Sequence, residues 1–189
     1  MIIGIYGFIG SGKTTATNYI VEKYHYQVID LDEISRQIMH QKASKEFIKT
    51  YFNQAYNPEK KDVDRKILRE IIFNSPLENQ KLSQYMWPKI KAKVGELINS
   101  PTKNIIIDGA ILPVLKLPLD KYIYIYAHEK ELVRRINLRD DANDHTTLEL
   151  IKYQDFLLNN CPKDFQIENN QNLEDLYRQI DLIMSKISH

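Results

Sequence analysis

Three glycines and a lysine near the start of the chain have the spacing of a phosphate-binding loop. Residues 7–14 read GFIGSGKT and fit the pattern GxxxxGK[ST]. Gly7 permits a tight turn, and Gly10 and Gly12 let the backbone curl so that its N–H groups point into one concavity. A helix that starts near Gly12 adds its partial positive charge at the same place. These residues predict a nucleoside triphosphate site.

The side chains of this loop have different expected roles. Lys13 is expected to neutralise the β- and γ-phosphates, which makes it a catalytic candidate, and Thr14 to offer its hydroxyl to Mg²⁺. The residues expected to bind ATP are Gly10, Ser11, Gly12, Lys13, Thr14 and Thr15. The alternative is a glycine-rich turn without a ligand, but average residue frequencies give a chance match a probability on the order of 1%.

Two carboxylates, Asp30 and Asp32, stand at the end of a second apolar run. If the strand persists through them, they point the same way. In a parallel sheet the carboxyl ends of neighbouring strands line one crevice, so both could face the phosphates. One carboxylate could accept the proton of an attacking hydroxyl, and the other could orient a metal-bound water. The alternative is that Asp32 caps a helix beginning at Glu33, and the residues alone leave both open.

A third apolar run also ends in a carboxylate. Three isoleucines at 105–107 precede Asp108, which is the form of a Walker B element. Such an aspartate supports Mg²⁺ directly or through water. An aspartate before Gly109 is also ordinary turn chemistry. Beside a phosphate loop, the metal role is the favoured interpretation.

Two arginines late in the chain are four residues apart. Arg135 and Arg139 share one face of a predicted helix, where like charges are unfavourable unless an anion lies between them. Arginines in a lid over a polyphosphate would stabilise the charge of the transferring group, so Arg135 is a catalytic candidate and Arg139 an ATP-binding one. The alternative is a solvated face on which Glu131 pairs with Arg135. The polar run 140–145 predicts a mobile lid tip.

Apolar runs alternate with amphipathic segments, which is typical of an α/β fold with a parallel sheet. Five strands are predicted, at Ile2–Tyr6, Tyr26–Asp30, Asn104–Asp108, Lys121–Ala127 and Phe165–Glu168. A helix is expected from Gly12 to Tyr24, another opens with a capping box at 146–149, and Asn172 can cap a last one. These elements predict the three-layer, nucleotide-kinase-like P-loop NTPase fold with a five-stranded sheet.

The stretch from about 44 to 100 breaks this alternation. It predicts consecutive helices without a strand, at 47–52, at 63–73 and over a longer segment broken or kinked at Trp87-Pro88. We interpret it as a helical, acceptor-binding insertion. The chain is thus expected to form one kinase domain over 1–189, with this insertion and a lid at about 134–147.

Composition excludes several classes of protein. With 26 Lys+Arg against 25 Asp+Glu, the net charge is +1, so no global field favours nucleic acid. No apolar stretch approaches the ~20 residues that span a bilayer, and no export signal is evident. Cys161 is the single cysteine, as expected in a reduced compartment. We therefore expect a cytoplasmic protein with a small-molecule substrate, as a monomer or a weak homo-oligomer.

The class of P-loop protein follows from what surrounds the loop. No Asn-Lys-x-Asp run that reads guanine occurs in the chain. A short chain with a helical insertion and late arginines fits a small-molecule kinase, which must hold an acceptor hydroxyl in line with the γ-phosphate and exclude water. Two alternatives stay open. One is a nucleoside or nucleotide kinase with the same loop and lid, and the other is an ATP-binding sensor without catalysis.

Taken in order, these residues resemble the dephospho-CoA kinase family. The family's motifs are matched at 10–14 (GSGKT), 29–32 (IDLD) followed by Arg36, 64–73 (DRKILREIIF), Arg135 with Arg139 and Asp140, Gln154, and 164–169 (DFQIEN). The resemblance runs over nearly the whole chain. Two positions depart from it: Trp87 stands where the family usually has histidine before proline, and the run at 110–114 lacks the family's acid.

The resemblance implies transfer of the γ-phosphate of ATP to the ribose 3′-hydroxyl of dephospho-CoA, which gives CoA and ADP. It implies that Asp32 or Asp30 supplies the base, of which we choose Asp32. The acceptor would be bound by Asp32, Arg36, Arg65 and Asp108, and Mg²⁺ by Thr14 and Asp108. The two departures lie on the acceptor side, so they concern the acceptor's identity rather than the phosphate chemistry.

Overall fold

The structure is a computed structural model, and it describes residues 1–99, 104–110, 112–140 and 144–187. The chain divides into two compact units. The first comprises Met1–Asp30 with Ile98–His189, and the second comprises Leu31–Leu97. The first unit contains a five-stranded sheet, and the second is built mainly of helices.

The first unit is built around a parallel sheet with the strand order β2-β5-β1-β6-β7. The strands are β1 (Ile2–Gly7), β2 (Gln27–Asp30), β5 (Ile105–Asp108), β6 (Lys121–Tyr126) and β7 (Phe165–Glu168). All five strands were predicted, with ends that agree to within one residue. The agreement follows from composition, because short runs rich in Ile, Val and Tyr are typical of strands covered on both faces.

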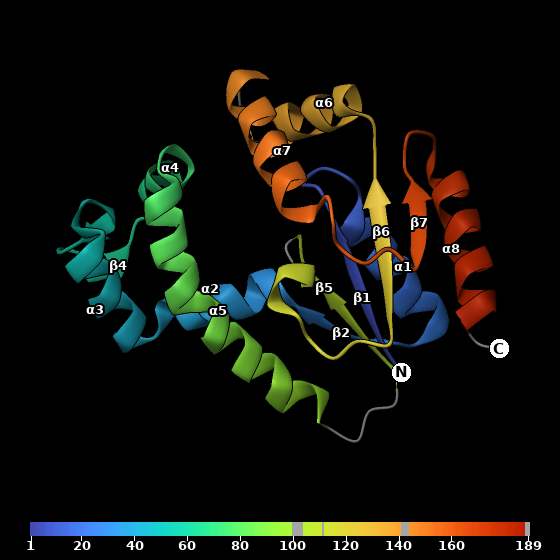
Figure 1. Ribbon diagram of the computed structural model, residues 1–189, viewed down its shortest axis with the longest axis horizontal. Helices are drawn as coiled ribbons and strands as arrows, with labels where there is room; N and C mark the ends of the chain where they lie inside the picture. The colour runs from blue at the N-terminus through green and yellow to red at the C-terminus, as the bar shows by residue number, and fades with distance from the viewer. Residues whose placement is uncertain (100–103, 111, 141–143, 188–189) are drawn as a thin grey trace. The chain divides into compact units, whose positions relative to one another are not determined.

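Helices cover the sheet of the first unit and lie beyond the ends of its strands. They are α1 (Lys13–Tyr24), the 3₁₀ turn η2 (Leu112–Leu115), α6 (Glu129–Asp140), α7 (Asp144–Leu158) and α8 (Leu173–Ile187). Helices α1 and α8 share one hydrophobic core with the sheet, and α6 with α7 lies at the end toward which β6 and β7 point (Figure 1). Each isoleucine fully buried in this core contributes roughly 1.5–3 kcal/mol relative to an exposed position.

Caps were predicted for the starts of two helices in this unit. The Oδ1 atom of Asn172 accepts a hydrogen bond from the Asp175 N–H at 3.0 Å, which confirms Asn172 as a cap of α8. The capping box predicted at 146–149 is wrong as the start of a helix, since α7 already begins at Asp144. The predicted lid tip includes residues 141–143, which lie outside the described residues.

The second unit packs its helices around a small core of its own. Its elements are α2 (Leu31–His40), α3 (Lys42–Tyr51), the 3₁₀ turn η1 (Asn53–Ala55), β3 (Tyr56–Asn57), β4 (Asp62–Val63), α4 (Arg65–Asn74) and α5 (Pro76–Ile98). Ile48, Phe52 and Leu68 are buried at its centre. The rings of Phe47 and Tyr85 stack beside them, with centroids 3.8 Å apart.

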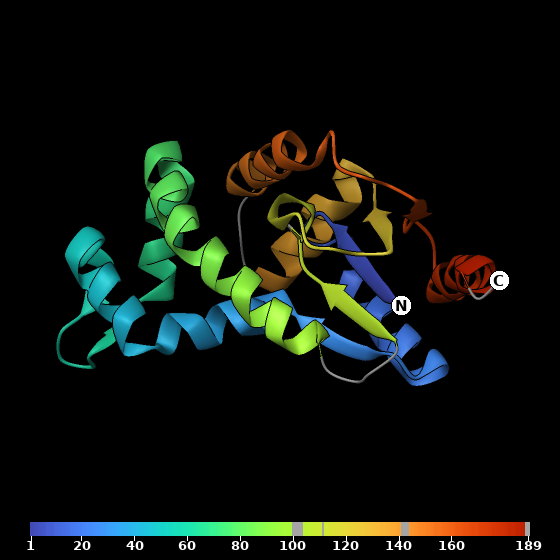
Figure 2. The same ribbon diagram turned by 60° about the horizontal axis from the view of Figure 1, so that its bottom comes forward.

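The structure of this stretch differs from the prediction at two places. A strand pair is present, because β3 and β4 form an antiparallel hairpin in which Tyr56 faces Val63. Tyr56 and Val63 are residues that favour strands, and both pack against the core of this unit. This packing stabilises the hairpin although each of its strands is only two residues long. Of the break or kink expected at Pro88, the break is absent: α5 continues through the proline as one helix (Figure 2).

The persistence of α5 has a packing explanation. A proline inside a helix costs roughly 3 kcal/mol because it removes a donor and clashes with the preceding turn. Met86, Ile90 and Val94 are buried on both sides of Pro88, and this burial offsets the cost. Among the described residues, no helix is long and apolar enough to cross a membrane.

Candidate active site

The phosphate loop joins β1 to α1 and takes a shape that only glycine permits. Gly10 and Gly12 have φ angles of 78° and 96°, which favour glycine. A Cβ added at Gly7 would lie 2.0 Å from the Ile125 carbonyl oxygen, and one at Gly12 would lie 2.2 Å from the Asn169 Nδ2 atom. The loop therefore needs both glycines for close approach as well as for conformation.

The start of α1, like that of α3, carries no acidic side chain. Its N-cap is Gly12, which provides no side-chain cap, and its first turn holds no acidic residue. The first turns of α2, α6 and α8 each hold two acidic residues. A helix N-terminus attracts negative charge, so this difference suits a ligand that brings its own.

The Ser11 hydroxyl is a second feature of the loop that suits a bound ligand. Ser11 is fully buried, and its Oγ atom is the one buried side-chain polar atom without a hydrogen bond in the described part of the chain. A buried hydroxyl without a partner is unfavourable by roughly 1–3 kcal/mol. A phosphate oxygen bound in the loop is one partner that would satisfy it, so the loop fits the phosphates of ATP.

The other loop side chains lie where a nucleotide can reach them. The Lys13 Nζ atom donates to the Phe8 carbonyl oxygen at 2.9 Å, which holds the lysine against the loop. Thr14 is exposed and Thr15 is half-buried. Thr15 lines a cavity of about 690 Å³ together with Gly10, Gly12, Arg135, Asn169 and residues 171–174. This volume is within the usual range for a small-molecule site.

Two carboxylates lie side by side at the carboxyl ends of β2 and β5. Asp30 and Asp108 are register partners in the parallel pair, and the Thr17 hydroxyl donates to Asp108 Oδ2 at 2.9 Å. Thr14 precedes Thr17 by one turn of α1. Carboxylate and hydroxyl oxygens suit Mg²⁺, which usually keeps several waters and phosphate oxygens as well. The described residues contain no group of three His, Cys, Asp or Glu that could hold a metal alone.

The prediction that Asp30 and Asp32 point the same way at the end of one strand is wrong. It required the strand to continue, but β2 ends at Asp30 and α2 begins at Leu31. The alternative that Asp32 caps a helix from Glu33 is wrong for the same reason. Asp32 is exposed in the first turn of α2, where a negative charge is favourable. Asp30 belongs to the first unit and Asp32 to the second.

The predicted acceptor residues of the second unit are held by local contacts. Arg36 donates from Nε and Nη2 to Glu33 Oε2, at 2.9 and 2.6 Å, and this lowers the pKa of Glu33. Arg65 is exposed as the first residue of α4. Asp64 caps that helix by accepting from the Lys66 and Ile67 N–H groups. Asp64, matched above as part of a motif, therefore has a structural function.

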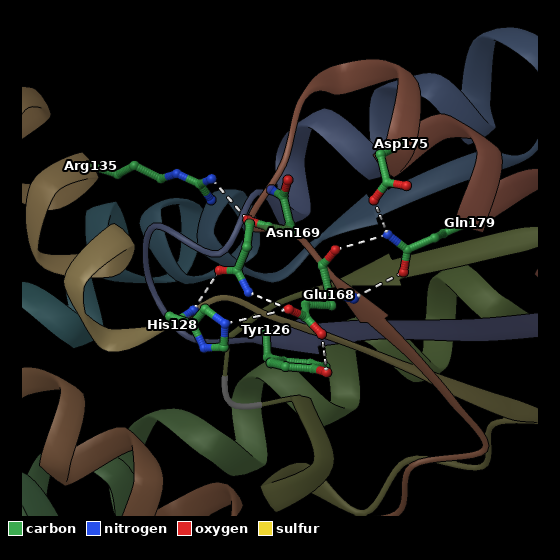
Figure 3. Close-up of polar contacts among 8 residues, drawn as sticks. Tyr126, His128, Arg135, Glu168, Asn169, Asp175 and Gln179 are labelled. Atoms are coloured by element: carbon green, nitrogen blue, oxygen red, sulfur yellow. Dashed lines mark hydrogen bonds and ion pairs between the residues drawn. The ribbon is translucent and has the colours of Figure 1, made fainter.

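Arg135 reaches from α6 to the phosphate loop, as Figure 3 shows for its contact with Asn169. Its Nη2 atom donates to the Asn169 carbonyl oxygen at 2.9 Å, and its Nη1 atom to the Gly10 carbonyl oxygen at 3.4 Å. The pair with Glu131 also exists, at 3.6 Å. Arg139 lies in α6, but its side chain is outside the described residues.

Two buried amides hold the loop in ways that the spacing of residues did not reveal. The Gln154 Oε1 atom, on α7, accepts from the Ile9 N–H at 2.8 Å. The Asn169 Nδ2 atom donates to the Ser11 carbonyl oxygen at 2.9 Å. Both residues entered the sequence analysis only as matches to a family motif. Their burial, inside α7 for Gln154 and just after β7 for Asn169, carries no local signal in the sequence.

The chain is similar over most of its length to proteins of one known family. The family model of dephospho-CoA kinase matches residues 1–175. The dephospho-CoA kinase of Fusobacterium nucleatum is 34% identical over 190 residues, which cover 96% of this chain and 95% of that protein. The chain belongs to the dephospho-CoA kinase family. It is therefore a kinase, and the predicted family is confirmed.

Solved structures confirm the fold of this family member. A Thermus thermophilus protein superposes with a TM-score of 0.78 at 23% identity, covering 100% of this chain and 98% of the other. The dephospho-CoA kinase from Campylobacter jejuni gives 0.65 at 22% identity, covering 99% and 96%. The predicted P-loop kinase fold with a five-stranded parallel sheet is thus confirmed.

Proposed function

We propose that this family member transfers the γ-phosphate of ATP to the ribose 3′-hydroxyl of dephospho-CoA, giving CoA and ADP, the last step of coenzyme A synthesis. The observation that carries the proposal is the phosphate loop. It combines glycine-only turns, a helix start without acidic residues and a buried hydroxyl without a partner. Family membership supplies the acceptor.

In this proposal the loop binds the phosphates and Lys13 neutralises the transferring group. Backbone N–H groups and Ser11 bind oxygens of the β- and γ-phosphates. Lys13 exchanges the Phe8 carbonyl oxygen, its partner in the structure, for phosphate oxygens of higher charge. Arg135, and Arg139 with it, would add positive charge from the lid at about 134–147.

Thr14 and Asp108 are the residues that we assign to Mg²⁺. When bound, the ion neutralises charge on the phosphate oxygens. The Thr17 hydroxyl holds Asp108 through a hydrogen bond of 2.9 Å, and Asp30 is its register partner. An oriented carboxylate beside a phosphate loop suits a direct contact or one through water.

Asp32 is the proposed base. It would accept the proton of the 3′-hydroxyl while that oxygen forms its bond to the γ-phosphorus and the bond to the β-phosphate oxygen breaks, with ADP as the leaving group. Asp30 is the second candidate for this proton. Asp32 is the preferred one on the family motif at 29–32, and it is exposed in the first turn of α2.

The acceptor is assigned to the helical insertion at about 44–100 together with Arg36, which precedes it in α2. Arg36 and Arg65 are the cations expected to bind it. Dephospho-CoA carries a diphosphate, and arginine binds phosphate oxygens in a bidentate way. Arg65 is exposed at the start of α4, where the helix N-terminus adds partial positive charge. Trp87, which departs from the family motif, makes the acceptor the part of this proposal that most needs a direct test.

The test is an acceptor profile measured with Mg²⁺ and ATP. ADP formation is followed with dephospho-CoA, with adenosine and deoxyadenosine, and with nucleoside monophosphates. We expect kcat/KM to be highest for dephospho-CoA and turnover to stop when EDTA removes the metal. Turnover only with a nucleoside or nucleotide would overturn the assigned acceptor. ATP binding without turnover on any acceptor would favour a sensor.

We further propose that the enzyme works in the cytoplasm without nucleic acid, as a monomer or a weak homo-oligomer. A net charge of +1 and a single cysteine support this. Light scattering coupled to size exclusion should give a mass near 22.3 kDa at micromolar concentration. A stable dimer at that concentration would contradict the monomer.

A further inference from the structure

Asn169 occupies a position between the phosphate loop and the end of β7. It is buried, with 9% of its surface exposed. Its backbone N–H donates to the Tyr126 carbonyl oxygen at 2.8 Å, which fixes the main chain to β6. Its carbonyl oxygen accepts from Arg135 on α6. The side chain of Asn169 thus projects from a main chain that is held on two sides.

The side-chain amide of Asn169 bonds to one loop carbonyl. The Nδ2 atom donates to the Ser11 carbonyl oxygen at 2.9 Å, across 158 residues of sequence. In a trans peptide, the carbonyl of one residue and the N–H of the next point in opposite directions. The structure contains no cis peptide among the described residues. A Ser11 carbonyl held toward Asn169 therefore turns the Gly12 N–H away from Asn169.

Gly12 is shaped to this arrangement. A Cβ on Gly12 would lie 2.2 Å from the Asn169 Nδ2 atom, well inside contact distance. The φ angle of 96° at Gly12 also places the peptide in a conformation that other residues rarely adopt. The glycine and the asparagine therefore require one another at this point of the loop.

We propose that Asn169 is a positioning residue, which holds the Ser11–Gly12 peptide so that the Gly12 N–H faces the phosphates of the nucleotide. The inference rests on the proposed ATP site and assigns Asn169 no contact with the reacting atoms. Without the amide, the peptide is free to rotate, and the loop loses the fixed direction of one donor.

The cavity gives a second interpretation that the test must separate. Asn169 also lines the cavity of about 690 Å³ beside the loop, where a nucleoside could touch it directly. A residue that contacts the nucleoside affects adenosine and ATP alike. A residue that orients a phosphate-binding peptide affects only ligands that carry phosphates.

The adjacent residue provides a matched control. Asn170 accepts from the His128 N–H at 2.7 Å and donates to Glu168 Oε1 at 2.7 Å. It has the same side chain on the same loop and is also anchored by side-chain hydrogen bonds, but neither of these two bonds reaches the phosphate loop. Asn170→Ala therefore measures the loss of an anchored amide without the effect on Ser11.

The experiment compares Asn169→Ala, Asn169→Asp and Asn170→Ala with the wild type. Equilibrium binding is measured for inorganic triphosphate, ATP, ADP and adenosine, and KM and kcat are measured with dephospho-CoA. We expect Asn169→Ala to weaken ATP and triphosphate about tenfold, since a buried carbonyl loses its donor, and to leave adenosine and the KM for dephospho-CoA unchanged. Asn170→Ala should bind all four ligands as the wild type does.

Asn169→Asp keeps the volume of the side chain, so it serves if the alanine variant does not fold. An ionised carboxylate cannot donate to the Ser11 carbonyl, but a protonated one can. We expect this variant to bind ATP weakly at pH 8 and to recover, relative to the wild type, as the pH falls toward 5. A side chain that only fills space beside the loop would give no such pH-dependent recovery.

The outcomes distinguish a failure of the positioning role of Asn169 from a failure of the proposed function. Equal losses for adenosine and ATP, or no loss for either, would overturn the positioning role while the proposed function stands. Loss of triphosphate affinity in Asn170→Ala would overturn it as well. Failure of the wild-type protein to bind ATP would overturn the proposed function and this inference together.

Discussion

The two units of this kinase hold their candidate residues in opposite ways. The phosphate loop is fixed by contacts that span the chain, from Gln154, Asn169 and Arg135, which lie 145, 158 and 125 residues from their loop partners. In the helical unit, Arg36 bonds to Glu33 three residues away, and Arg65 is exposed. The phosphate side is held by contacts from distant parts of the chain before a ligand binds, whereas Arg36 on the acceptor side bonds to a residue of its own helix.

This difference predicts how the two sides respond to mutation. Changes at the loop should reduce the rate itself, because they remove interactions made with the transferring phosphate. Changes among the exposed cations should act mainly on the KM for the acceptor, because they remove binding shared by the substrate and the transition state. Four sets of variants, taken in order of decreasing expected effect, test this difference between the two units.

The largest effect is expected for Lys13→Ala. Removing the positive charge from the loop should lower kcat by about 10³–10⁵-fold, since in the proposed role the lysine stabilises charge on the transferring group. Lys23→Ala is the matched control, because it removes a lysine from the other end of the same helix, where Lys23 pairs with Asp181. Steady-state kinetics with dephospho-CoA measure both. A Lys13→Ala enzyme with normal kcat would contradict the assigned role.

Asp32→Asn should follow. Loss of the proposed base should lower kcat by about 10²–10⁴-fold while the affinity for ATP stays the same. Asp30→Asn, which changes the register partner of Asp108, is the companion variant. A larger loss of kcat in Asp30→Asn than in Asp32→Asn would assign the role of the base to Asp30 instead.

Arg65→Ala is expected to have a moderate effect on one substrate. Losing a charged contact to the acceptor's phosphates should raise the KM for dephospho-CoA about tenfold and leave the KM for ATP unchanged. Lys66→Ala removes the next exposed cation on α4 and should leave both values near those of the wild type. If Arg65→Ala alters only the KM for ATP, the division between the two sides is wrong.

The smallest effects are expected for two helix caps, one in each unit. Asp64→Ala and Asn172→Ala remove the caps of α4 and α8, and each should lower the free energy of unfolding by about 1 kcal/mol. Thermal unfolding measures the stability, and kinetics show which substrate is affected. Asp64→Ala should alter only the KM for dephospho-CoA, and Asn172→Ala, beside the cavity, only that for ATP. The reverse pattern would contradict the contrast between the units.

The sequence predicted the parts of the fold whose signals are local. The strands were correct because each is a short run rich in isoleucine, valine or tyrosine, and the phosphate loop was recognised because its glycines and lysine lie within eight residues. The dephospho-CoA kinase family was also correctly identified. In each case neighbouring residues carry the information.

The errors have a shared physical cause. The hairpin β3–β4 and the continuity of α5 at Pro88 depend on burial against residues elsewhere in the second unit. Asp32 points the same way as Asp30 only if β2 continues for two more residues, and the periodicity of the sequence does not decide where a strand ends. The contacts of Asn169 and Gln154 with the loop join distant parts of the chain, so no local pattern reveals them.

The most direct test of the account follows the terminal phosphate of ATP in a single turnover. The enzyme, in excess over ATP that carries a labelled γ-phosphate, is mixed with Mg²⁺ and dephospho-CoA, and the products are separated. We expect the label to appear on the ribose 3′-oxygen of CoA, with one ADP formed per label, and Lys13→Ala to slow its appearance. Label that stays on ATP, or that passes to water at the same rate with and without dephospho-CoA, would contradict this expectation.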